Sequence, residues 1–148
     1  MNINKITFKL KSLLINESSK KREKLTYELA KEHQHLIELI KKIKQEQNYK
    51  KKLKLLNKFY YEYNLHTLKE EKQLYNYLKI KYKFLPDKQE YIQQKHKEIK
   101  DITNFIEEFA KKYSKNIQTE EFEKEFKTLE NILVQRIKLE EEKLFSLY

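Results

Sequence analysis

The chain has 148 residues, enough for one domain, and with 39% hydrophobic and 38% charged residues it can bury only a thin, striped core. The absence of cysteine excludes disulfides, thiolate metal sites and a cysteine nucleophile, and it fits a reducing, cytoplasmic location. Glycine is also absent and there is one proline, whereas sheets with tight turns normally need glycine at positive φ, so an all-α fold is predicted.

The net charge of +10 would suit nucleic acid, an anionic membrane or an acidic protein. The lysines are spread over all the predicted helices and form no single stripe, so nucleic-acid binding is not favoured. No apolar run approaches the roughly 18–20 residues of a membrane span. The first residues lack the apolar core and cleavage site of a secretory signal, and a transit peptide is a minor alternative.

Residues 1–18 differ from the rest of the chain, because their apolar side chains fit two patterns. Ile6, Phe8 and Leu10 alternate as in a strand, while one face of a short helix would hold Ile3, Ile6, Leu10, Leu13 and Leu14. Since no other strand is expected, we predict an arm or short helix over residues 1–18. A break at residues 16–19 would then separate it from a bundle domain over residues 19–148.

The first long helix is predicted over residues 20–47 and has one apolar face. His33 stands on this face where an apolar residue is expected, whereas His35 is rotated by about 200° and should face solvent. The apolar members of the face are Leu25, Leu29, Leu36, Ile37, Ile40 and Ile43.

After a turn at residues 45–49, a second helix is predicted to run to about residue 84. His66 and Glu70 lie inside its apolar face, and their i, i+4 spacing points both side chains the same way, one turn apart. The apolar members of this face are Leu56, Phe59, Tyr63, Leu74, Tyr77 and Leu78.

The run Leu85-Pro86-Asp87 ends the second helix, since the residue before a proline disfavours helical geometry. Asp87 and Glu90 predict a capping box that opens a third helix, which runs to about residue 113. His96 stands on the apolar face of this helix, together with Ile92, Ile99 and Ile106.

A polar break at residues 114–118 precedes a fourth helix, predicted over residues 119–148. Its apolar face becomes polar between residues 136 and 141, where Arg136 and either Glu140 or Glu141 point inward. Helical spacing leaves the choice between the two glutamates open. The apolar members of the face are Phe122, Phe126, Leu129, Leu133, Ile137 and Leu144.

Four helices with short links predict an up-down-up-down antiparallel four-helix bundle. Every helix then places a titratable group inside, which is unfavourable unless the group binds a metal or another buried partner. Imidazole and carboxylate together suit Fe, Zn or Mn. The alternatives are satisfied core histidines, a local hydrogen bond between His66 and Glu70, and a surface pair of Arg136 and Glu140. No catalytic constellation accompanies these groups, so a non-enzymatic protein is expected.

Four stretches resemble the hemerythrin-like (HHE cation-binding) domain over about residues 25–148. They are Glu-His33-Gln-His-Leu, His66-Thr-Leu-Lys-Glu70-Glu71, Lys-His96-Lys-Glu-Ile and Arg136-Ile-Lys-Leu-Glu-Glu141. The resemblance implies a four-helix bundle that holds two non-haem irons with five histidines and two bridging carboxylates. A role in iron binding, iron storage or oxygen and redox sensing is the corresponding expectation.

Carried over to this chain, the resemblance implies metal ligands at His33, His66, Glu70, His96 and Glu141. Two family histidines are replaced, one by Ile92 and the other by Arg136, and both serve the same iron. The site would therefore be degenerate, and one iron ion, two ions or none all stay open. In the one-ion case the guanidinium of Arg136 is expected in the place of the second iron.

The run Arg-Ile-Lys-Leu-Glu-Glu-Glu-Lys-Leu, and the separation of His66 from Arg136, are also similar to the regulator-of-sigma-D family. That resemblance implies a metal-free helical bundle that binds the major RNA polymerase sigma factor. The Asp-Arg-Trp-Leu element expected on the first long helix is absent. A metal-free transcription regulator is therefore kept as the alternative to a metal-binding protein.

Overall fold

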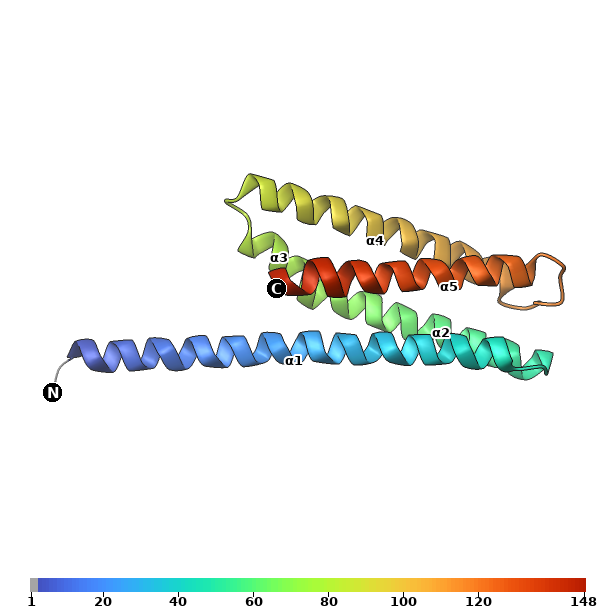
Figure 1. Ribbon diagram of the computed structural model, residues 1–148, viewed down its shortest axis with the longest axis horizontal. Helices are drawn as coiled ribbons and strands as arrows, with labels where there is room; N and C mark the ends of the chain where they lie inside the picture. Colours follow the sequence, from blue (N-terminus) through green and yellow to red (C-terminus); the bar gives the residue numbers. More distant parts are fainter. Residues whose placement is uncertain (1–2) are drawn as a thin grey trace.

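The computed structural model describes the backbone of residues 3–148 and the side chains of residues 20–148. Four helical rods lie side by side in alternating directions, and no strand occurs among residues 3–148 (Figure 1). The predicted all-α, up-down-up-down bundle is confirmed. The first rod is α1 (Ile3–Gln45). The second rod comprises α2 (Tyr49–Glu70), η1 (Glu71–Tyr75) and α3 (Asn76–Lys81), and the third is α4 (Pro86–Tyr113). The fourth rod comprises α5 (Phe122–Leu139), η2 (Glu140–Leu144) and η3 (Phe145–Leu147).

The links between the rods are short and lie where the sequence predicts them. Before α2, the side chain of Asn48 accepts a hydrogen bond from the backbone N–H of Lys51 at 3.1 Å and caps the helix. The predicted capping box at Asp87 is wrong, because α4 already begins at Pro86. Proline has no N–H to satisfy and a helical φ, so it suits the first helical position and leaves Asp87 inside the first turn.

Residues 3–18 are helical, but they continue α1 without interruption, so the predicted break at residues 16–19 is wrong. Asparagine, serine and glutamate lower helix propensity by only a few tenths of a kcal/mol to about 0.7 kcal/mol each, and no glycine or proline is present to end the helix. Figure 1 shows the first part of α1 extending beyond the ends of the other rods. The division into residues 1–18 and a bundle domain stays a prediction.

The bundle has two apolar clusters with a polar layer between them. Leu36, Phe59 and Leu133 belong to the cluster that contains the end of α1, and Leu29 and Leu144 belong to the cluster near the α3–α4 turn. The polar side chains that lie between these positions along the rods are buried: His33, His66, Glu70, Arg136 and Glu140. Since buried polar groups need partners, this layer is where the fold requires specific interactions.

Two π-helical segments adjoin the buried glutamates of the polar layer, since η1 follows Glu70 and η2 begins at Glu140. In η1 the N–H of Asn76 donates to the carbonyl of Glu71, and in η2 the N–H of Phe145 donates to the carbonyl of Glu140. An i→i+5 turn holds about one residue more than an α-helical turn, so it rotates the residues that follow. As a result Tyr75 is buried, whereas Tyr77, which α-helical spacing predicts in the core, is half-buried.

Among the residues that the structure describes, no helix combines the length and apolarity needed to cross a membrane.

We predict that deleting residues 1–18 leaves the bundle folded, because the first core side chain described in α1 is Leu25. The midpoint of thermal unfolding, followed by circular dichroism, should shift by less than about 3 °C. Deleting residues 1–30 is the control. It removes Leu25 and Leu29 and should lower stability by about 3–6 kcal/mol. Equal effects of the two deletions would contradict the prediction.

Candidate metal centre

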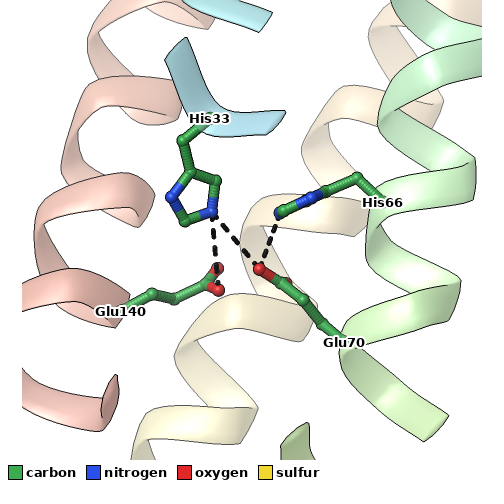
Figure 2. A group of neighbouring side chains, drawn as sticks. All are labelled: His33, His66, Glu70 and Glu140. Carbon is green, nitrogen blue, oxygen red and sulfur yellow. Dashed lines mark hydrogen bonds and ion pairs between the residues drawn. The ribbon is translucent and has the colours of Figure 1, made fainter. Parts of the chain in front are cut away.

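Four buried side chains from three rods converge in the polar layer. They are His33 of α1, His66 and Glu70 of α2, and Glu140 at the start of η2, and one nitrogen or oxygen of each lies within 4.8 Å of all the others. Figure 2 shows the two imidazoles facing the two carboxylates. Facing helices of a bundle hold metal ions with side chains of these types.

The converging atoms are Nε2 of each histidine, Oε1 of Glu70 and Oε2 of Glu140. His33 Nε2 lies 3.3 Å from Glu70 Oε1 and 3.8 Å from Glu140 Oε2. His66 Nε2 lies 2.6 Å from Glu70 Oε1, but outside hydrogen-bond geometry. Both His66 Nε2 and Glu140 Oε2 are buried with no hydrogen-bond partner among residues 20–148. Each such atom destabilises the fold by about 1–3 kcal/mol, and one cation at the centre would satisfy both, so the donor set fits a divalent metal.

The outward nitrogen of each histidine faces a carboxylate. His66 Nδ1 lies 3.1 Å from Glu32 Oε1, and His33 Nδ1 lies 3.0 Å from Glu141 Oε1. With Nδ1 protonated, each ring donates to its carboxylate and turns the lone pair of Nε2 toward the cluster. Lys69 in turn holds Glu32, with Nζ 2.7 Å from Oε2. Histidines that ligate metals are oriented in this way.

The buried guanidinium of Arg136 spans the two glutamates of the cluster. Its Nη2 donates to Glu70 Oε2 at 2.6 Å and its Nε donates to Glu140 Oε1 at 2.7 Å. Each carboxylate therefore gives one oxygen to the arginine and turns the other toward the histidines. The remaining donor group, Nη1, bonds to the hydroxyls of Tyr63, Thr67 at 3.2 Å and Thr103 at 3.0 Å.

The two glutamates have opposite pKa shifts. Burial alone would raise the pKa of Glu70, but the charge of Arg136, together with Glu140 and His66, holds it well below its usual range. Burial and the adjacent charge of Glu70 raise the pKa of Glu140 well above its usual range, in spite of Arg136. Of the two glutamates, Glu140 therefore holds a proton more readily in the metal-free cluster, and a bound cation would compete with that proton.

Two of the predicted ligands do not reach the cluster. Glu140, and not Glu141, is the buried glutamate of the fourth rod, while the side chain of Glu141 is 32% exposed and pairs with His33 Nδ1. His96 lies against η1, with Nε2 2.5 Å from Glu71 Oε1 and its ring stacked on Tyr75. Ile92, which stands where the family resemblance expects a further histidine, is packed in the apolar cluster near the α3–α4 turn.

His96 pairs with Glu71, the residue next to Glu70, and not with the cluster. The α4 residue whose hydroxyl contacts Arg136 and Tyr63 is Thr103, seven residues or about two turns later on the same face.

Sequence reasoning missed several residues that support the cluster. Helical spacing puts Tyr63 on an apolar face, and no pattern in the sequence marks Thr103 or Glu32 as a polar partner. The inward position of Arg136 indicates that hydroxyls such as those of Tyr63 and Thr103 must lie nearby, because a buried guanidinium has five N–H donors that need acceptors. The burial of Tyr75, whose hydroxyl has no partner among residues 20–148, depends on η1 and had no clear signal.

An antiparallel four-helix bundle with a buried histidine–carboxylate cluster is the architecture of a metal-binding bundle protein. The family model of the hemerythrin HHE cation-binding domain matches residues 24–148, so the chain belongs to this family. Comparisons with curated proteins and with solved structures found no match. The family and the buried cluster together fit a metal-binding role.

We predict that Arg136→Met destabilises the metal-free protein by about 3–5 kcal/mol, because it leaves buried carboxylates without their counter-charge. The free energy of unfolding in urea, measured in the presence of a chelator, tests this. Arg136→Met combined with Glu70→Gln and Glu140→Gln removes the uncompensated charges and should recover most of the loss. A single variant as stable as the wild type would contradict the ion-pair account.

Proposed function

We propose that the chain binds one iron ion per molecule and serves in iron binding or in oxygen and redox sensing. The ligands in this proposal are Nε2 of His33, Nε2 of His66, Oε1 of Glu70 and Oε2 of Glu140. The observation that carries the proposal is the convergence of these four buried atoms, two of which have no hydrogen-bond partner among residues 20–148. Two imidazoles and two carboxylates suit Fe(II), with Zn(II) and Mn(II) as chemical competitors.

The proposal is limited to one ion because of Arg136. Its guanidinium holds Glu70 Oε2 and Glu140 Oε1, the oxygens that would be needed to bridge to a second ion. A fixed positive charge at that place also repels a second cation. The packing of Ile92 among apolar side chains supports the same limit, because it offers no ligand atom.

In this proposal the protein's groups bind and orient, and iron supplies the redox chemistry when bound. His33 and His66 bind through Nε2, while Glu141 and Glu32 hold their Nδ1–H groups, fix the ring orientations and raise ligand basicity. Arg136 keeps two carboxylates stable in a buried layer whether or not the ion is present. A cytoplasmic location stays a prediction.

The alternative is a metal-free interaction module of the sigma-factor-binding kind. The ion pairs of Arg136 with Glu70 and Glu140 favour it, because they supply a counter-charge to the buried carboxylates without a metal. Failure of the anaerobically purified, iron-replete protein to retain metal would favour this alternative and contradict the proposed iron site. Co-purification with the sigma factor from cell extract would support it directly.

We predict that elemental analysis finds one metal ion in the wild type and none in His66→Ala, which removes a ligand. Arg136→His should gain a second ion, because it replaces the fixed cation with a further imidazole. His35→Ala is the matched control, since His35 is exposed and pairs with Glu62 outside the cluster, and it should keep one ion. Two ions in the wild type would contradict the role of Arg136.

We also predict different effects for the two neighbouring glutamates of η2. Glu140→Ala should abolish stoichiometric binding, because it removes a ligand atom. Glu141→Ala should weaken the metal affinity by about 10- to 100-fold, as expected for a residue that orients a ligating histidine. Titration with Fe(II) or Co(II) under anaerobic conditions measures both dissociation constants. The reverse order of effects would identify Glu141 as the ligand.

A further inference from the structure

The turn between α3 and α4 leaves large apolar side chains in solvent. Ile80 is 75% exposed, Phe84 86% and Leu85 51%. The three side chains lie within six residues of one another, where α3 ends at Lys81 and α4 begins at Pro86. A group of exposed apolar side chains, in contrast to single ones, marks an interaction site.

Lysines surround this apolar group. Lys83 and Lys88 are exposed, and their Nζ atoms lie 5.6 Å from the ring centre of Phe84 and 5.0 Å from that of Tyr82. Lys79 is half-buried at the same turn. Lys81 is held by the main-chain oxygens of Leu147 and Tyr148. Asp87 is the acidic residue of residues 79–88, and Glu90 follows two residues after the segment. We call residues 79–88 the basic tip, because an apolar centre is combined with an excess of positive charge.

The N-terminal part of α1 leaves the bundle at the same end as the basic tip (Figure 1). Arg22, near this end of the bundle, donates from Nη1 to the hydroxyl of Tyr77 in α3 at 3.4 Å. By sequence, the preceding residues form an amphipathic helical pattern with lysines at positions 5, 9 and 11 and no acidic residue before Glu17. Helices with this combination bind at membrane interfaces.

We propose that the basic tip docks on an anionic membrane surface. Ile80, Phe84 and Leu85 enter the boundary between headgroups and acyl chains, while Lys83 and Lys88 contact the lipid phosphates. This peripheral docking needs no membrane-spanning helix. It rests on exposed residues at one end of the bundle and is independent of metal binding in the polar layer.

The chemistry of the tip favours a membrane over two other occupants. Nucleic acid would use stacking on aromatic rings, whereas two of the three exposed side chains, Ile80 and Leu85, are aliphatic. A second copy of the chain would bring two lysine-rich tips together, and like charges repel. An anionic bilayer complements both features, because its headgroups carry negative charge and its acyl chains accept aliphatic side chains.

The test is flotation of the full-length chain with vesicles of phosphatidylcholine alone or mixed with phosphatidylglycerol. We expect binding only to the anionic vesicles and weaker binding at high salt. Phe84→Glu and Ile80→Glu should each lower the partition coefficient about tenfold or more, since burying one such side chain is lost. Leu65→Glu is the matched control, because Leu65 is also 51% exposed but lies on α2, away from the tip, and it should bind as the wild type does.

Three results would overturn the proposal. The first is failure of the wild type to bind anionic vesicles at low salt. The second is that Phe84→Glu and Ile80→Glu bind the vesicles as well as the wild type does. If deleting residues 1–18 then abolishes flotation, the membrane element would be residues 3–14 and not the basic tip. The third is a dimer in light scattering, or an RNA complex in gel shift, that Phe84→Glu abolishes while vesicles are not bound. That result would assign the tip to a second copy or to nucleic acid.

Discussion

The ion pairs of Arg136 with Glu70 and Glu140 are the interaction on which the rest of this bundle depends. Two carboxylates that are fully buried side by side would repel each other and lose their hydration, and the forked guanidinium between them offsets both effects. The guanidinium also divides the four carboxylate oxygens of Glu70 and Glu140 into two pairs. One from each glutamate is bound to the arginine, and the other is left to face His33 and His66. One arginine thus stabilises the polar layer and sets the number of free ligand atoms in it.

The polar layer also gives the bundle its register. It separates two apolar clusters, and apolar packing alone tolerates sliding and repacking of similar side chains. The guanidinium instead requires acceptors from α2, α4 and the fourth rod at fixed distances, through Glu70, Thr103 and Glu140. Glu32 and Glu141 add the outward contacts of the two histidines. The contacts that align the helices therefore also bring the four candidate ligand atoms together.

The bundle and most of its buried cluster were predictable from the sequence, because both depend on a period of 3.6 residues and on polar residues at apolar positions. His33, His66 and Glu70 stand out in that pattern, and Arg136 does so on the fourth rod. The π-helical segments were not predictable in this way, since one extra residue per turn rotates Tyr75 into the core and Tyr77 toward its edge. The choice between Glu140 and Glu141, and the pairing of His96 with Glu71, depend on how the rods are rotated about their axes, which a period alone does not give.

X-ray absorption at the iron K-edge of the anaerobically iron-loaded chain tests the central claim most directly, because it reports the neighbours of the metal. With Arg136 in the place of a second ion, the spectrum should contain imidazole and oxygen scattering from His33, His66 and the two carboxylates, with no iron–iron contribution. A clear iron–iron contribution at full loading would contradict the account, since it would require a second ion where the structure has the guanidinium.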